Sequence, residues 1–262
     1  MLPGPTLRNI NLRCMPFTLA HPAIVLPLLR PLRRHLSATA LILGAMAPDF
    51  EYFLRLRPDG IYGHTLAGIF WLDIPLVVLF AMLFHRLVKQ PLIHCLPRPM
   101  RQRLVWPARQ PWPWRRAFRA PVLLGAFVGT VSHILWDAFT HDDGGVVLHW
   151  PLLMQPVAVG ALHWPIYKFL QHGSTLAGFF GIGWFLWQLP AQAGPARLPL
   201  PAQRTFWLAI GGIVLLLWGP FMLYSARIWP FDLASVIVTG MSAGLVGVLV
   251  AAGTIRRRFL AS

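Results

Sequence analysis

The chain has 262 residues, of which 56% are hydrophobic and 12% are charged, whereas a typical soluble domain has about 25% charged residues. This composition excludes an ordinary soluble domain and predicts an all-α, polytopic helical membrane protein. The net charge of +15 would suit nucleic acid, but no basic soluble module is visible, and no nucleic-acid partner is expected.

The N-terminal region is predicted to differ from the rest of the chain. Residues 1–14 are polar and irregular, and we interpret them as a disordered tail or an upstream extension ahead of a single membrane domain over residues 15–262. The first apolar run, Leu19–Leu29, contains two prolines and is too short to cross a bilayer alone. A short re-entrant or interfacial segment is therefore expected there.

About six transmembrane helices are predicted from later apolar runs, because a spanning helix needs about 20 largely apolar residues. The predicted segments are Leu36–Leu54, Leu66–Val88, Pro121–Thr140, Ser174–Leu189, Gln203–Tyr224 and Asp232–Ile255. The first of them only just suffices, since it contains Asp49 and Glu51. The stretch Pro91–Pro113 is rich in Pro and Arg and is interpreted as a linker.

The basic residues indicate an orientation. Four segments hold 17 of the 23 Lys and Arg residues, namely 30–34, 86–119, 191–204 and 256–258. Alternating helices would place all four on one side, and the positive-inside rule assigns that side to the cytoplasm. We expect a multi-pass protein of a bacterial-type inner membrane, with membrane lipids as its partners and its basic loops near anionic headgroups.

Three ligand-type residues share one face of a predicted helix. His133, Asp137 and His141 are spaced four apart, so their side chains lie one turn above another. An imidazole and a carboxylate at this spacing can hold one divalent metal from a single helix. Taken alone, the pattern favours a plainer interpretation, in which a His–Asp hydrogen bond braces neighbouring membrane helices.

Further ligand-type residues fall at a matching depth in the predicted topology. His21, Asp49 and His64 all lie toward the non-cytoplasmic face, as the three residues above do. Two or three histidines with one or two carboxylates form the ligand set of zinc or another hydrolytic transition metal. Asp73, inside the third segment, is expected to pair with another helix, and His85 on the basic side is expected to be solvated.

The chain resembles a family of uncharacterised bacterial membrane proteins, domain-of-unknown-function family 4184. The motifs that carry the resemblance are Met15-Pro-Phe-Thr-Leu-Ala-His21-Pro, Ala47-Pro-Asp49-Phe-Glu51-Tyr52, His64-Thr-Leu-Ala-Gly68, Ser132-His-Ile-Leu-Trp-Asp137 and Gln171-His-Gly-Ser-Thr-Leu-Ala-Gly178. Their order is also similar to that of inner-membrane metal-dependent hydrolases and, distantly, of zinc-dependent phospholipase C.

That resemblance implies a divalent metal, with zinc as the expected ion. The implied ligands are His21, Asp49, His64, His133 and Asp137. The soluble enzymes of this kind bind three metals and use their mature N-terminus as a ligand. With residues 1–14 ahead of Met15, this chain has no counterpart of that ligand.

The leading hypothesis is a membrane-embedded metal-dependent hydrolase acting on a phosphoester, such as a lipid headgroup, at the outer face. Glu51 and His141 are its expected catalytic residues, and Arg55 and Arg57 could pair with the phosphate. Two alternatives stay open: a transporter-like protein, and a structural membrane protein whose His–Asp pairs brace helices. The motifs of serine hydrolases, nucleotide hydrolases and dinucleotide oxidoreductases are absent.

Overall fold

The computed structural model describes residues 18–160, 162–193, 198–225 and 233–259. The predicted tail over residues 1–14 lies outside the described residues. Within the described part, the protein is built from helices and a two-stranded antiparallel sheet, and the predicted helical class is confirmed.

Short helices form the N-terminal third. They are η1 (Thr18–Ala20), α1 (Pro22–Val25), η2 (Leu26–Leu28), α2 (Ala38–Gly44), η3 (Ala47–Asp49) and α3 (Phe50–Arg55). The prediction of one spanning helix over Leu36–Leu54 is therefore wrong. Pro48 cannot continue the hydrogen-bond ladder of α2, and the chain tightens into the 3-10 turn η3 before α3 starts. The left-handed residue Leu56 then ends α3.

Four described helices are long and apolar enough to cross a membrane: Leu66–Cys95, Ala120–Thr140, Leu200–Ser225 and Leu233–Arg258. The first is a continuous run of α4 (Leu66–Gly68), η4 (Ile69–Asp73), α5 (Ile74–Leu83), η5 (Phe84–Val88) and α6 (Lys89–Cys95), in which η4 and η5 are π-helical. The others are α8 (Ala120–Thr140), α11 (Leu200–Ser225) and α12 (Leu233–Phe259). The predicted count of about six is not confirmed, although α10 (Ile166–Gln188) contains all but the last residue of the predicted Ser174–Leu189 segment.

Two connecting regions have secondary structure of their own. The stretch Pro91–Pro113, interpreted as a linker, is largely helical, since it contains the end of α6 and all of α7 (Arg98–Arg109), and that interpretation is wrong. It is followed by η6 (Trp114–Phe118). The connection between α8 and α10 contains α9 (Gly145–His149), η7 (Pro151–Met154) and the hairpin of β1 (Pro156–Val159) and β2 (Leu162–Pro165). Val159 pairs with Leu162 across the turn, where Gly160 takes a positive φ of 61°.

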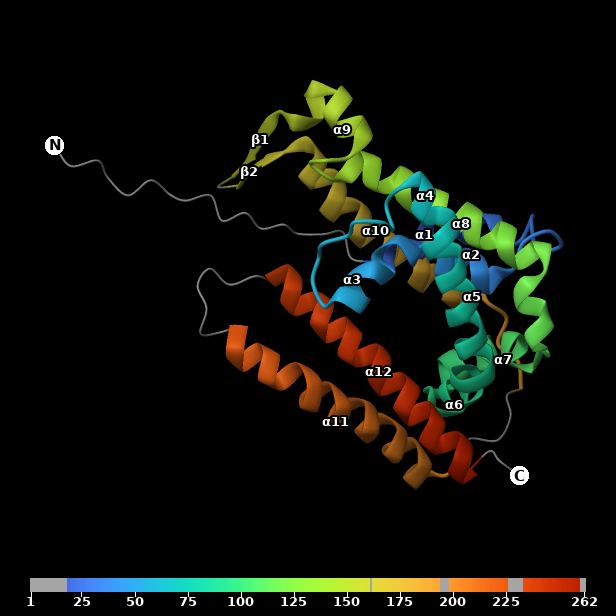
Figure 1. Ribbon diagram of the computed structural model, residues 1–262. Coiled ribbons are helices and arrows are strands. Elements are labelled where there is room, and N and C mark those ends of the chain that lie inside the picture. Colours follow the sequence, from blue (N-terminus) through green and yellow to red (C-terminus); the bar gives the residue numbers. More distant parts are fainter. Residues whose placement is uncertain (1–17, 161, 194–197, 226–232, 260–262) are drawn as a thin grey trace.

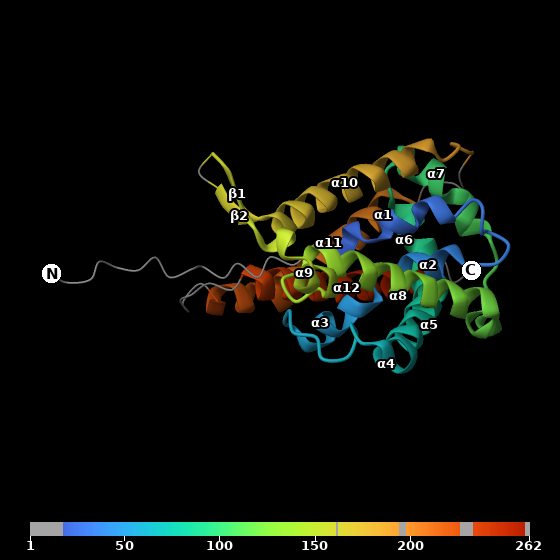
Figure 2. The same cartoon turned by 90° about the horizontal axis from the view of Figure 1, so that it is seen from above.

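The long helices α8 and α12 run lengthwise, with the β hairpin at one end and α7 at the other (Figure 2). Three of the basic segments meet at the α7 end. The Gln192 N–H donates to the Gln102 carbonyl, and the Ser37 N–H, just after residues 30–34, donates to the Pro121 carbonyl at the start of α8. We call this the basic end. Figure 1 shows α11 and α12 as an antiparallel pair along one side of the molecule.

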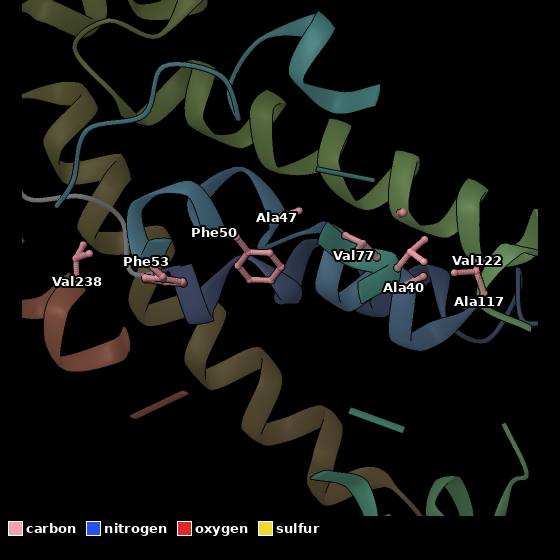
Figure 3. Close-up of a cluster of buried hydrophobic side chains, with 10 residues drawn as sticks. Ala40, Ala47, Phe50, Phe53, Val77, Ala117, Val122 and Val238 are labelled. Atoms are coloured by element: carbon pink, nitrogen blue, oxygen red, sulfur yellow. The ribbon is translucent and has the colours of Figure 1, made fainter. Parts of the chain in front are cut away.

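Buried apolar side chains connect α12 to the short N-terminal helices. One cluster runs from Val238 on α12 past Phe53 and Phe50 to Ala40 and Val122 (Figure 3). A second cluster joins the end of α6 to α11 and α12 near the basic end. These contacts hold η3 and α3 against the long helices, and with them the side chains of Asp49 and Glu51.

Glycines bring α2 unusually close to α8. A Cβ atom added at Gly129 would collide with the Leu41 carbonyl oxygen, and one added at Gly44 would lie 2.5 Å from the Ala126 carbonyl oxygen. Small residues of this kind let membrane helices approach backbone to backbone. The close contact brings the carbonyl of Ala45, the residue directly after α2, within 2.9 Å of the His133 ring on α8.

We expect Gly129→Ala to destabilise the protein by about 1–3 kcal/mol, because the new methyl group forces α2 away from α8. Gly181→Ala on α10 is the matched control, because a Cβ there meets no atom within 4 Å. Thermal unfolding of both variants in detergent is the measurement. Equal melting temperatures for the two variants would show that the close approach contributes nothing to stability.

Candidate metal centre

The centre is built on α8, where His133 and Asp137 lie one turn apart and are both buried. The His133 Nε2 atom is 3.1 Å from Asp137 Oδ2. With a rise of about 1.5 Å per residue, Asp137 lies about 25 Å along α8 from Ala120 at the basic end. These residues therefore lie near the end of α8 that is opposite the basic end.

The break between α2 and α3 places a second carboxylate against this pair. Asp49 ends η3, and its Oδ1 lies 3.6 Å from His133 Nε2. Its other oxygen, Oδ2, accepts a hydrogen bond of 2.6 Å from the Thr18 hydroxyl on η1. The Asp49 side chain is only 3% exposed, and the bond from Thr18 fixes which of its oxygens faces the histidine.

The fourth side chain, His64, comes from the loop that precedes α4. Its Nε2 atom lies 3.6 Å from Asp49 Oδ1 and 3.4 Å from Asp137 Oδ2. Thr65 directly after it caps α4 by accepting a hydrogen bond from the Gly68 N–H. The imidazole of His64 is the most exposed of the four, with 29% of its side chain accessible.

Asp49, His64, His133 and Asp137 form a group that could hold a metal ion, because each offers one ligand atom and these atoms all lie within 4.8 Å of one another. Metal–ligand bonds of about 2 Å in a tetrahedral shell imply ligand atoms about 3.3 Å apart. The four His–Asp distances given above run from 3.1 to 3.6 Å and match that edge length.

The hydrogen bond of His133 fixes its tautomer in the way that metal ligands require. The Nδ1–H group donates to the Ala45 carbonyl at 2.9 Å, which leaves a lone pair on Nε2. That Nε2 atom is buried and makes no hydrogen bond among the described residues, although two carboxylate oxygens lie near it. In the neutral ring this lone pair faces two carboxylates, which is repulsive, and either a proton or a metal ion at Nε2 would remove the repulsion.

His21 and His141 lie on the other side of Asp137. His21 Nε2 is 3.0 Å from Asp137 Oδ1, and its ring stacks on His133 with 4.0 Å between centroids. His141 Nδ1 is 3.5 Å from the same Oδ1 atom. The four-atom group does not include His21, so its role as a metal ligand stays a prediction, as does the catalytic role of His141.

Glu51 accepts hydrogen bonds from the loop between α3 and α4. Its carboxylate accepts hydrogen bonds of 2.8–2.9 Å from the backbone N–H groups of Ile61, Tyr62 and Gly63, and a 3.2 Å bond from Arg55. Burial alone would raise the pKa of Glu51, but these donors hold it below its usual value. The catalytic role stays a prediction, while the contacts show a carboxylate that fixes the three residues just before His64.

Sequence reasoning missed several supporting groups. Thr18 precedes His21 by three residues, and Tyr52 follows Asp49 by three, which places both inside motifs already noted. The Tyr52 hydroxyl lies 3.4 Å from His64 Nδ1, and burial raises the pKa of Tyr52, so this hydroxyl stays protonated. The Ala45 carbonyl has no signal in the sequence, because any residue supplies a backbone oxygen.

Two other sequence expectations are wrong. Asp73 pairs with no other helix among the described residues, where both its buried oxygens lack a hydrogen-bond partner. His85 is not simply solvated. It lies 2.9 Å from the Thr39 hydroxyl and stacks on Trp112 with 4.3 Å between ring centroids.

Comparison with known proteins gives one match. The sequence model of a family described as Domain of unknown function (DUF4184) matches residues 15–253. No curated protein and no solved structure matches the chain. The similarity to hydrolases inferred from motif order is not shown by these comparisons.

We expect Glu51→Ala to weaken zinc binding by about tenfold to a hundredfold, a typical effect of losing a group that orients a metal ligand. Without the Glu51 carboxylate, the loop over residues 61–63 no longer fixes His64. Asp59→Ala is the control, because Asp59 lies in the same loop but is exposed, and its carboxylate forms a 3.7 Å ion pair with Arg57 and, among the described residues, no bond with the loop backbone. Competition with a chelating dye gives the affinities, and unchanged binding by Glu51→Ala would refute the positioning role.

Proposed function

The chain belongs to the DUF4184 family, and we propose that it is a membrane-embedded metal-dependent hydrolase of phosphoesters. The observation that carries the proposal is the group of two histidines and two carboxylates, three of them buried, whose ligand atoms converge within 4.8 Å. This donor set suits zinc, which takes histidine nitrogen and carboxylate oxygen ligands in tetrahedral sites.

We assign each residue a role in the proposed reaction from its contacts. His64, His133, Asp49 and Asp137 would hold the ion, and the ion would supply a water acidic enough to act as a nucleophile near neutral pH. His141 is partly exposed beside Asp137 and would serve as the general base that accepts the proton of that water. A substrate would reach the group from the side of His64, the most exposed member.

A phosphoester is favoured over other substrates by the neighbouring charge and by the membrane. Arg55 is held by Glu51 next to the loop of His64, and a guanidinium pairs well with a phosphate. Four apolar helices indicate a membrane protein, so a lipid headgroup is the phosphoester nearest to the centre. We propose an inner-membrane location with the centre at the non-cytoplasmic face, which cysteines introduced at positions 109 and 155 would test by labelling on opposite sides.

The structural alternative has support of its own. Bonds from Thr18 to Asp49, from His21 to Asp137 and from His133 to Ala45 tie η1, η3, α2 and α8 together without any metal. A bracing role alone predicts that removing the centre's carboxylates lowers stability and leaves metal content unaffected. A transport path has less support, because the cluster of Phe50, Val77 and Val122 is packed with apolar side chains (Figure 3).

We expect the purified protein to contain one divalent ion per chain and to hydrolyse a chromogenic phosphodiester or the headgroup of phosphatidylglycerol. A chelator should abolish hydrolysis, and zinc should restore it. Activity should fall at acidic pH, because protonated histidines cannot bind metal.

His64→Ala and Asp137→Asn should lose both bound metal and hydrolysis, while Asp143→Asn, an exposed carboxylate just beyond α8, should keep both. Metal content is measured by elemental analysis, so the metal centre is tested even if the true substrate differs from those assayed. A protein that binds no divalent ion would refute the metal centre. A loaded protein that cleaves no phosphoester would refute the proposed reaction.

A further inference from the structure

The carboxylates of this chain are unevenly distributed. The eight are Asp49, Glu51, Asp59, Asp73, Asp137, Asp142, Asp143 and Asp232, so none occurs in residues 74–136 or 144–231. The basic end contains nine Lys and Arg residues between positions 86 and 119. Helix α7 contacts α6 and α10, and neither helix carries an Asp or Glu. The basic side chains of α7 therefore have no carboxylate to pair with on α6 or α10.

One of these cations is buried with two donor atoms that have no partner among the described residues. Arg101 on α7 is 9% exposed, and its Nε and Nη1 atoms are buried and make no hydrogen bond among the described residues. Two other cations of this region, Lys89 and Arg103, do have hydrogen-bond partners. Lys89 is also buried, but its Nζ donates to the Gln110 carbonyl at 2.8 Å. Arg103 donates to the Trp187 carbonyl and lies over the Trp187 ring. A buried guanidinium with unused donors is costly, and an anion would relieve that cost.

An apolar cavity begins one helical turn away. It has a volume of about 600 Å³ and is lined by Cys95, Pro97, Leu200, Gln203, Arg204, Trp207 and Leu208. The Pro97 carbonyl accepts a hydrogen bond from the Arg101 N–H at 3.0 Å, which places Arg101 one turn along α7 from the cavity wall. The indole of Trp207 donates to the Cys95 carbonyl and so joins α11 to α6 across the cavity.

We propose that this cavity binds one anionic phospholipid from the membrane leaflet at the basic end. An acyl chain would lie against the apolar wall formed by Pro97, Trp207 and Leu208. The headgroup phosphate would accept hydrogen bonds from Arg101 and from Arg204, whose exposed side chain lines the cavity. The proposal is independent of the metal centre, because none of the four residues of that centre lines this cavity.

The lipid is favoured over a free phosphate by two features that act together. The buried cation requires a negative group, and the cavity wall beside it is largely apolar, so an anion with a hydrocarbon chain satisfies both. A zwitterionic lipid would bring its own positive charge toward Arg101 and Arg204. We therefore expect phosphatidylglycerol to bind and phosphatidylcholine with the same chains to bind much more weakly.

The test uses the full chain, delipidated in a non-ionic detergent. Native mass spectrometry counts bound lipid, and thermal unfolding reports its effect during titration with phosphatidylglycerol, phosphatidylcholine or inorganic phosphate. One tightly held phosphatidylglycerol per chain is expected for the wild type. Arg101→Gln should weaken that binding about tenfold to a hundredfold, the range for a charged hydrogen bond. Arg103→Gln, on the same helix with a partner of its own, should leave it unchanged.

The following results would overturn the proposal. Equal binding of phosphatidylcholine and phosphatidylglycerol, or full binding by Arg101→Gln, would overturn it. Stabilisation by inorganic phosphate alone, equal to that by the lipid, would overturn the lipid as the occupant. If Arg101→Gln does not fold, Arg204→Gln serves in its place, because Arg204 is exposed and its loss should weaken phosphatidylglycerol binding without unfolding the protein.

Discussion

Two buried carboxylates that face the same two histidines impose the main constraint on this structure. Asp49 and Asp137 each place an oxygen within 3.6 Å of the Nε2 atoms of His64 and His133. Burying ionised carboxylates is costly unless an opposite charge balances them. Hydrogen bonds from Thr18 and His21 satisfy the outer oxygens, and a divalent cation among the inner atoms would balance the charge.

The rest of the fold can be understood as a support for this group. Close contact between α2 and α8 at Gly129 brings the Ala45 carbonyl to His133 and fixes the tautomer of that ring. The break at Pro48 lets η3 turn Asp49 toward α8, where a continuous helix would not. Glu51 then accepts a hydrogen bond from the Gly63 N–H and so fixes the loop directly before His64. Each ligand therefore has at least one neighbour that fixes its direction, as metal ligands in proteins usually do.

Much of the centre could be predicted from the sequence, because helical spacing and membrane depth are local properties. The interval of four places His133 and Asp137 on one face of α8 in the structure, as expected. Other features depend on contacts between distant segments. Hydropathy favoured one helix over Leu36–Leu54 because it counts apolar residues and cannot weigh the break at Pro48. The expected pairing of Asp73 failed for the same reason, since no sequence pattern indicates whether a facing helix offers a donor.

The central claim is that two histidines and two carboxylates bind one divalent ion, and X-ray absorption at the zinc edge of the zinc-loaded protein tests it most directly. Nitrogen and oxygen neighbours at about 2.0–2.2 Å are expected, with the multiple scattering of two imidazole rings and no sulfur. A shell without imidazole scattering, or a sulfur neighbour at about 2.3 Å from a cysteine such as Cys95, would show that the ion is bound elsewhere.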